Sequence, residues 1–330
     1  MARIFILGDV RRGGLLALAA AALFGLSTPA AKAIVGNVAP LVLAGLLYLG
    51  SGLGLLLFRA IRGEGGVALR RGDLPWLAGA VLFGGGLGPA LLMWGLVRTT
   101  GSAASLLLTL EGVFTALIAW IVFREPFNRR IGIGMAAIFV GAVVLALRGP
   151  PGAAAALGAA AVAGACLCWA IDNNLTSHIS HVDAPTLAMI KGLVAGSVNL
   201  ALGLAIGGAL PGTGTVAAAG AVGLLGYGLS LILFVLALRE VGAARTGAYF
   251  STAPFLGAVL GVVALHERLT LALIVAGLLM AFGVYLHLTE PGAGPDRRER
   301  DAAEEDAAKG AARDSANPTE GPPAENVARR

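Results

Sequence analysis

Charge is scarce in this sequence, which therefore lacks the polar surface of a water-soluble fold. Of the 330 residues, 13% are charged and 57% are hydrophobic, whereas a soluble domain carries roughly 25% charged residues. The charge is also uneven, because 17 of the 43 charged residues (24 basic and 19 acidic) lie between Glu290 and Arg330. The preceding chain is too apolar to cover itself in water and indicates an all-α integral membrane protein in a lipid bilayer.

Cysteine and catalytic motifs are also rare. Cys166 and Cys168 lie two apart in an apolar run, so they do not face each other on a helix and predict neither a disulfide nor a metal site. His178 and His181 are interpreted as solvated loop residues. No Gly-x-Ser-x-Gly, His-Glu-x-x-His or phosphate-binding loop occurs. The sequence therefore predicts no enzyme, no metal and no cofactor, and the net charge of +5 is interpreted as setting membrane orientation rather than binding nucleic acid.

Apolar runs long enough to cross a bilayer dominate what is present. The first run, with Arg11-Arg12 before it and Ala31-Lys32-Ala33 near its end, also has features of a secretory signal, but a related segment later in the chain favours a membrane span. Ten transmembrane helices are predicted, at residues 14–34, 40–58, 74–97, 102–122, 129–147, 155–177, 185–207, 216–238, 243–264 and 270–289.

Basic residues between these runs predict the orientation. With the N-terminus inside, twelve arginines fall in inside segments and four basic residues fall outside. Cytoplasmic loops are enriched in Lys and Arg. The sequence therefore predicts a multi-pass protein of the cell (inner) membrane with both termini cytoplasmic. Residues 290–330 have almost no large apolar side chains and predict a disordered cytoplasmic tail.

The chain repeats itself. A shift of 145 residues places Ser27-Thr28 on Asp172-Asn173, and a shift of 142 places Glu111-Gly112 on Ala253-Pro254. We predict one five-helix repeat over 1–148 and a second over 149–289. An odd number of spans inserts the second repeat in the opposite orientation, which is the inverted-repeat plan of secondary transporters.

Each half also contains an apolar helix that ends in Glu and is followed by a short turn and a Gly-rich helix. The two motifs end at Glu125 and Glu267. This pattern, over about residues 14–289, resembles the EamA family of the drug/metabolite transporter superfamily. The resemblance implies ten helices around a central cavity, alternating access and, often, export of amino acids or related metabolites. Family members often have proline where this chain has Glu111-Gly112, so a looser helix break is expected there.

Glu111 is the strongest candidate for substrate binding or coupling. It is predicted near the middle of the fourth span, where an ionised carboxylate must face a cavity, be paired or be protonated. Such a group could couple transport to protons. The alternative is a neutral Glu that is hydrogen-bonded to a neighbouring helix for packing.

Asp172 and Lys191 form a second candidate. They lie about 8–9 Å below the same membrane surface in adjacent spans, by the rise of 1.5 Å per residue, so an ion pair is expected. A structural pair and snorkelling side chains are the alternatives. Asn173, beside Asp172, adds a donor for a polar substrate.

Further candidates follow from the repeat and from aromatic positions. Ser27 and Thr28 match the polar group at Asp172-Asn173 in the second half, and Trp169 and Tyr249 neighbour polar positions and are candidates to line a cavity. Prolines within spans are expected to break helices or act in gating, namely Pro29, Pro89 and Pro254.

These features predict a secondary transporter for a small-molecule substrate, driven by proton exchange or by the substrate gradient. The alternative is a membrane scaffold or sensor without transport activity. The sequence leaves the substrate, the direction of transport and the oligomeric state open.

Overall fold

The computed structural model describes residues 2–62, 69–124, 128–148 and 153–289, and the elements in these ranges are helical. The predicted tail at 290–330 and the motif residue Glu125 lie outside the described residues. The α-helices are α1 (Ala2–Val35), α2 (Pro40–Arg62), α3 (Leu74–Ala80), α4 (Gly88–Arg98), α5 (Gly101–Leu107), α6 (Leu110–Phe123), α7 (Arg129–Arg148), α8 (Ala153–Ser177), α9 (Ala184–Ala205), α10 (Thr213–Gly223), α11 (Ser230–Phe250), α12 (Ala253–Ala264) and α13 (Leu271–Leu288). A 3-10 turn, η1 (Arg71–Asp73), and two π-helical segments, η2 (Val81–Leu87) and η3 (Leu224–Leu229), complete the fold.

Ten helical spans in the described residues are long and apolar enough to cross a membrane, which confirms the predicted fold class. They are Arg12–Val35, Pro40–Arg62, Arg71–Arg98, Gly101–Phe123, Arg129–Leu147, Ala154–Ser177, Ala184–Ala205, Thr213–Gly242, Arg245–Ala264 and Leu271–Leu288. The predicted ends differ from these by no more than four residues. The ends of the spans were predicted well because the apolar runs stop at Arg, Gly and Pro residues.

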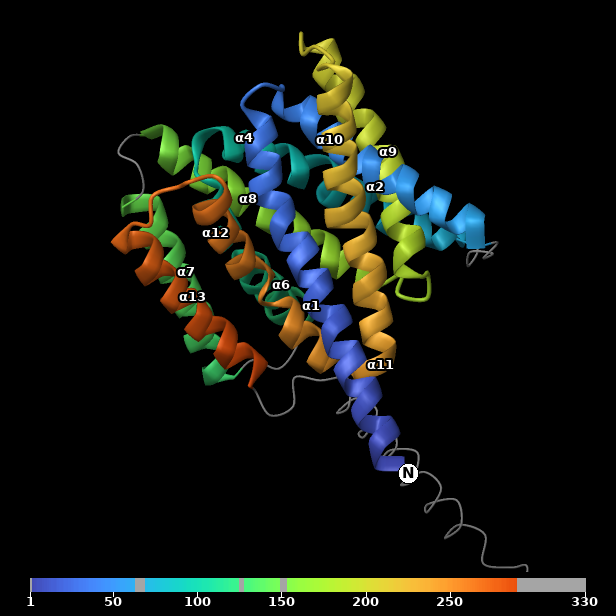
Figure 1. The fold of residues 1–330 in the computed structure, drawn as a ribbon, viewed down its shortest axis with the longest axis vertical. Helices are drawn as coiled ribbons and strands as arrows, with labels where there is room; N and C mark the ends of the chain where they lie inside the picture. The colour runs from blue at the N-terminus through green and yellow to red at the C-terminus, as the bar shows by residue number, and fades with distance from the viewer. Residues whose placement is uncertain (1, 63–68, 125–127, 149–152, 290–330) are drawn as a thin grey trace, which may run out of the picture. The chain divides into compact units, whose positions relative to one another are not determined.

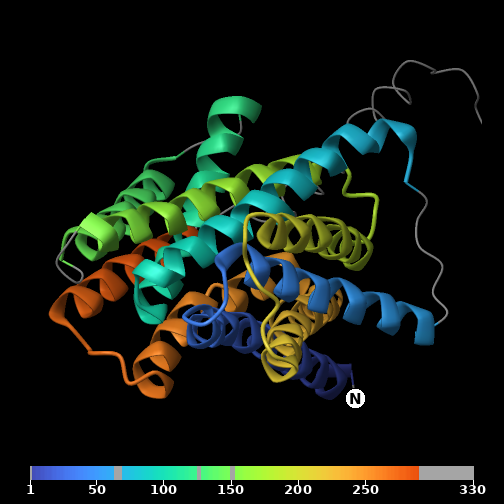
Figure 2. The same ribbon diagram turned by 90° about the horizontal axis from the view of Figure 1, so that it is seen from above.

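The helices of the two halves interleave in one bundle (Figures 1 and 2). α2 packs on α9 and α7 on α13, which pairs the second and fifth spans of one half with the second and fifth spans of the other. α1 packs on α11 and α12, while α8 packs on α4 and α6. The first span of each half therefore contacts the third and fourth spans of the other half. This packing pattern is unchanged when the halves are exchanged, which supports the predicted repeat.

Glycine permits the closest of these contacts. A Cβ at Gly192 of α9 would lie 2.7 Å from Cα of Gly52 on α2, which is closer than real Cβ contacts allow. Small residues let transmembrane helices approach until their backbones touch, so van der Waals contacts and not burial from water hold the pair together.

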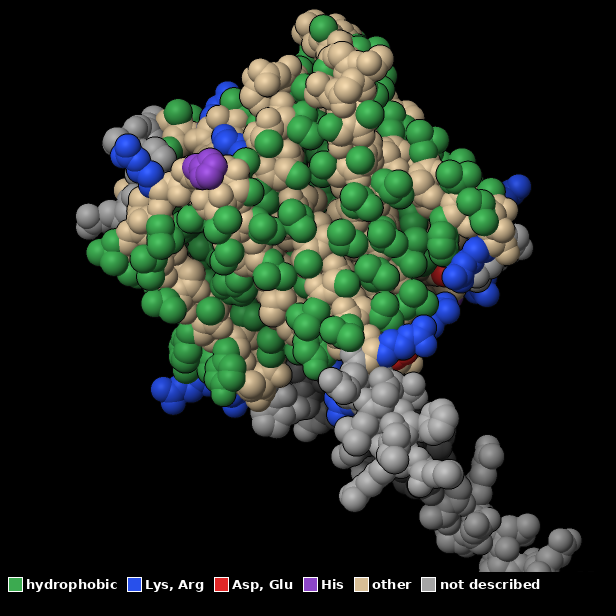
Figure 3. Space-filling model, in the orientation of Figure 1, with side chains coloured by type: hydrophobic (Ala, Val, Ile, Leu, Met, Phe, Trp, Pro, Cys, Tyr) green, Lys and Arg blue, Asp and Glu red, His purple; other side chains and the backbone are tan. Residues whose placement is uncertain are grey.

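The outer surface of the bundle is apolar. Figure 3 shows hydrophobic side chains over α1, α11, α12 and α13, with Lys and Arg side chains gathered toward the edges of this face. Large exposed side chains include Val259, Val263, Leu278 and Phe282. An exposed apolar surface of this extent matches the hydrocarbon of a bilayer.

Four spans are interrupted, in two equivalent pairs. The third and eighth spans contain η2 and η3, and the fourth and ninth spans break at residues 108–109 and 251–252. The break at 108–109 forms although the first half lacks the proline that the family often has. In both breaks a threonine hydroxyl donates to the carbonyl three residues earlier: Thr109 to Leu106 at 2.8 Å and Thr252 to Tyr249 at 2.7 Å.

The three predicted helix-breaking prolines differ in their surroundings. Pro89 and Pro254 lie in the first turns of α4 and α12, directly after an interruption, where no backbone N–H is needed. Pro29 is buried inside α1, which continues through it to Val35. The proposed roles of all three in gating stay predictions.

Candidate substrate cavity

A cavity of about 290 Å³ lies between the helices of the bundle. Both halves of the chain contribute to it, through α1, α2, α6, α8, α9, η3 and α11. Its lining combines six aromatic side chains with a few polar ones. The lining residues are Phe24, Tyr48, Ser51, Glu111, Trp169, Asn173, Ala188, Lys191, Gly192, Gly226, Tyr227, Ser230, Leu231, Phe234 and Phe250.

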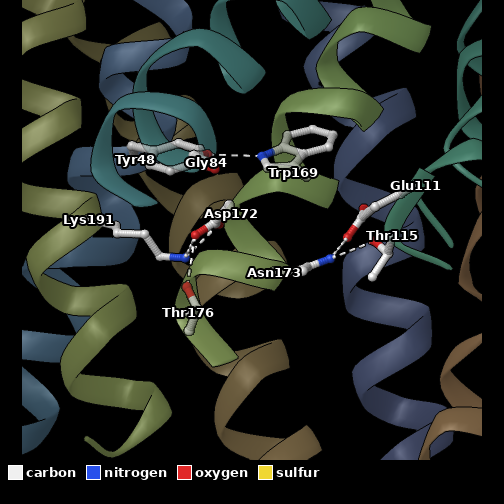
Figure 4. A network of polar contacts seen from close by, with 9 residues as sticks. All are labelled: Tyr48, Gly84, Glu111, Thr115, Trp169, Asp172, Asn173, Thr176 and Lys191. Atoms are coloured by element: carbon white, nitrogen blue, oxygen red, sulfur yellow. Dashed lines mark hydrogen bonds and ion pairs between the residues drawn. The ribbon is translucent and has the colours of Figure 1, made fainter. Parts of the chain in front are cut away.

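Glu111 enters this cavity from the first turn of α6 (Figure 4). Nδ2 of Asn173 donates to Oε1 of Glu111 at 2.9 Å and lies 3.4 Å from Oγ1 of Thr115. The sequence predicts Glu111 inside a continuous span, but the break at 108–109 places it at a helix start.

Asp172 and Lys191 form the predicted ion pair. Nζ of Lys191 lies 2.8 Å from Oδ2 and 3.0 Å from Oδ1 of Asp172, and Oγ1 of Thr176 donates to Oδ1 at 3.0 Å. The side chains are 8% exposed for Asp172 and 19% for Lys191. Lys191 lines the cavity with its charge already compensated (Figure 4).

The π-helical segment η2 supplies a backbone acceptor beside the cavity. The carbonyl oxygen of Gly84 accepts hydrogen bonds from the Tyr48 hydroxyl at 2.8 Å and from Nε1 of Trp169 at 2.9 Å. A Cβ at residue 84 would overlap the Asp172 carboxylate. π-helical turns are rare and frequent at functional sites. Sequence reasoning missed this segment, although Gly84-Gly85-Gly86 in the third span and Gly226-Tyr227-Gly228 in the eighth were visible signals.

Five of the lining aromatic rings form a continuous series that sequence reasoning also missed. Ring centroids are 5.6 Å apart for Tyr48 and Tyr227, and 6.2 Å for Tyr227 and Phe24. The series continues from Phe24 to Phe250 at 5.4 Å and from Phe250 to Phe234 at 4.9 Å. It joins residues from α1, α2, η3 and α11, so no local pattern could reveal it.

The structure brings four predicted residues into the cavity lining, namely Glu111, Asn173, Lys191 and Trp169, with Asp172 paired behind them. Ser27 and Thr28 are buried in α1 and do not line the cavity; the Ser27 hydroxyl donates to the carbonyl of Phe24 at 2.6 Å. Tyr249 is also outside the lining, since it is 36% exposed and approaches Gly14, while the next residue, Phe250, lines the cavity.

Polar contacts tie the bundle together at the end remote from the N-terminus. The Glu267 carboxylate accepts the backbone N–H groups of Gly101 and Ser102, at 2.6 and 2.8 Å, and so caps α5. Nζ of Lys32 donates to the carbonyl of Leu96. These contacts connect α1, α4, α5 and the segment before α13.

The loop histidines at the other end are exposed, in agreement with their interpretation as solvated loop residues, and each side chain also has a partner. The His178 ring stacks on Trp76 with centroids 4.0 Å apart, and Nε2 of His181 lies 3.0 Å from Oδ2 of Asp73. Within the described ranges, no group of three or more His, Cys, Asp or Glu side chains could hold a metal ion.

Comparison with known proteins identifies the class of this bundle. The sequence model of the EamA-like transporter family matches the chain twice, at residues 11–147 and 156–289. The chain belongs to the EamA-like transporter family. Two successive matches agree with the repeated architecture, and the family is one of transporters rather than enzymes. The predicted repeat boundary at 148/149 stays a prediction.

Two further similarities extend this assignment. An uncharacterized transporter of Methanothermobacter thermautotrophicus is 28% identical over 282 residues, which are 80% of this chain and 82% of that protein. A solved crystal structure of a protein aligns with a TM-score of 0.62 and 20% identity, over 83% of this EamA-like transporter and 94% of the other chain. At that identity, the second similarity shows the fold alone.

Proposed function

We propose that this EamA-like transporter is a secondary carrier that exports amino acids or related small metabolites by alternating access. The observation that carries the proposal is the contact between Glu111 of the first half and Asn173 of the second, at the wall of the cavity. A site at the junction of two repeats is the arrangement that secondary transporters use.

The position of the cavity meets one requirement of export, which is access from the cytoplasm. Lys191 lies seven residues into α9, and Asn173 lies four residues before α8 ends, so both are nearer the end of the bundle where the N-terminus begins. The excess of arginine between spans supports an inner-membrane protein with that end in the cytoplasm. Contacts of Glu267 and Lys32 hold the opposite end together. In this orientation the cavity receives substrate from the cytoplasm.

Proton coupling is assigned to Glu111. Its carboxylate lies in a transmembrane span, lines the cavity and has the neutral Asn173 amide as its hydrogen-bond donor. Ionisable residues within membrane spans usually serve transport, because burying them is costly. A carboxyl group that faces the cavity can gain and lose a proton as access changes.

Flux measurements on purified protein in liposomes test the proposal. A panel of labelled amino acids and related metabolites is screened with and without a pH gradient. We expect at least one compound to be transported, faster with the gradient, and Glu111→Gln to remove the response to the gradient. Glu240→Gln is the control, because Glu240 lies outside the cavity and pairs with the exposed Arg12 at 3.4 Å.

Three results have different meanings. Wild-type flux and an unchanged pH response in Glu111→Gln would disprove coupling through this residue. Flux that never responds to the gradient would leave a carrier driven by its substrate gradient. Absence of flux for the whole panel, together with absence of ligand-induced thermal stabilisation, would favour a scaffold or sensor.

A further inference from the structure

The charges around the cavity do not balance. Lys191 is neutralised by Asp172, with both carboxylate oxygens within 3.0 Å of its Nζ. Glu111 has a neutral partner, Asn173, and the described residues place no Lys, Arg or His within ion-pair distance of it. With Glu111 ionised, the lining therefore carries one uncompensated negative charge.

The Glu111 carboxylate also has room for a second partner. A carboxylate offers about four lone-pair sites, and the hydrogen bond from Asn173 uses Oε1. An ammonium group brings up to three donors and a positive charge, and a charge-assisted hydrogen bond is about twice as strong as a neutral one. A carboxylate on the substrate finds no unpaired cation among the described lining residues, because Asp172 already compensates the charge of Lys191.

The aromatic side chains of the lining also favour a positively charged ligand. The faces of aromatic rings attract cations within about 6 Å of the centroid. Tyr48, Tyr227, Phe24, Phe250 and Phe234 form a series with neighbouring centroids 4.9–6.2 Å apart, and all five line the cavity together with Glu111. These rings also provide apolar area for the body of a ligand.

We infer that this cavity selects small organic cations, namely primary amines with an apolar body, over zwitterions and anions of the same skeleton. The ammonium group binds Glu111 and the face of the Phe24 ring, and the apolar body lies against the rings of Tyr227 and Phe250. The volume of about 290 Å³ suits a compact ligand. This inference rests on the proposed transport function and narrows its substrate to amines related to amino acids by loss of the carboxylate.

Two matched series test the charge selection by equilibrium binding to the purified protein. The aromatic series is 2-phenylethylamine, phenylalanine and 3-phenylpropanoate, and the aliphatic series is isoamylamine, leucine and 4-methylpentanoate. Calorimetry and ligand-induced thermal stabilisation report binding without requiring transport. We expect the amine of at least one series to bind at least about tenfold more tightly than its zwitterion and its acid, since a hydrogen bond to a charged group corresponds to that factor or more.

Two variants distinguish the contribution of the Glu111 charge to amine binding from that of the aromatic rings. Glu111→Gln is expected to weaken amine binding at least about tenfold and to abolish the preference over the zwitterion. Phe24→Leu retains an apolar side chain but removes the ring face, and is expected to weaken amine binding by about 2- to 30-fold. Phe282→Leu is the matched control, because Phe282 is 50% exposed on α13 and lies outside the lining.

The outcomes distinguish this inference from the transport function. Equal or tighter binding of the zwitterion or acid in both series overturns the inference, as does absence of binding by both amines. Flux of any compound in the broader liposome panel would then leave the carrier function standing. Selective amine binding without flux in liposomes would support the charge selection and count against transport.

Discussion

Asp172 and Lys191 provide a quantitative test of how this cavity is held in a low-dielectric bundle. Their side chains are 8% and 19% exposed, and the closest N–O distance is 2.8 Å. Removing one member of such a pair leaves a buried charge without its partner, which typically costs about 3–5 kcal/mol. Replacing both members costs less than the sum, because no charge is then left uncompensated.

The perturbation is a double-mutant cycle of Lys191→Met and Asp172→Asn. We expect each single variant to lose about 3–5 kcal/mol of unfolding free energy, with a coupling energy of about 1.5–3 kcal/mol between them. Thr176 still donates to Asp172 in Lys191→Met, which places that variant toward the lower end of the range.

Titration with sodium dodecyl sulfate in mixed micelles, followed by tryptophan fluorescence, gives the unfolding free energies. The control cycle uses Arg12→Met and Glu240→Gln, a pair 3.4 Å apart whose Arg12 side chain is 74% exposed. Its coupling is expected to be about 0–1 kcal/mol. Additivity of the Asp172 and Lys191 variants within about 0.5 kcal/mol would refute a neutralised pair, and with it the charge balance used to infer amine selection.

Two further predictions concern the backbone. Gly84→Ala is expected to impair folding and transport together, because the added methyl group overlaps the Asp172 carboxylate. Gly86→Ala is the control and should be tolerated in both thermal stability and flux assays, since its Cβ meets nothing closer than 3.6 Å. Equal effects of the two substitutions would contradict the close approach of Gly84 to Asp172. Glu267→Ala removes the acceptor for two N–H groups of α5 and should cost about 1–3 kcal/mol in unfolding free energy, while Arg268→Ala, at an exposed neighbouring residue, should change it little. A loss no greater than that of Arg268→Ala would show that Glu267 does not stabilise this end of the bundle.

The sequence predicted the spans well because hydropathy is a local property. Each membrane helix must be apolar over about 20 residues, whatever it packs against, so its ends can be read from single arginines, glycines and prolines. The ion pair between Asp172 and Lys191 was also predictable, since adjacent spans place residues equally far from one membrane surface at the same depth.

The interior geometry was not predictable in the same way. Residues 106–110 read Leu-Leu-Leu-Thr-Leu, with no glycine or proline, yet the helix breaks at 108–109 and moves Glu111 to a helix start. The aromatic series joins Phe24, Tyr48 and Tyr227 from three distant segments. Both features depend on packing between spans, so the residues near them carry no signal of their own. Tyr249 shows the limit of neighbourhood reasoning, because the adjacent Phe250 lines the cavity instead.

The acceptor that joins Tyr48 and Trp169 is a main-chain oxygen, that of Gly84. A mutational scan replaces side chains and leaves this oxygen in place at every position. Tyr48→Phe and Trp169→Phe would therefore each remove one of the two hydrogen bonds to this oxygen, and no substitution removes the oxygen itself. Selection on sequence can preserve this junction only indirectly, through the two donors and through the absence of a side chain at residue 84.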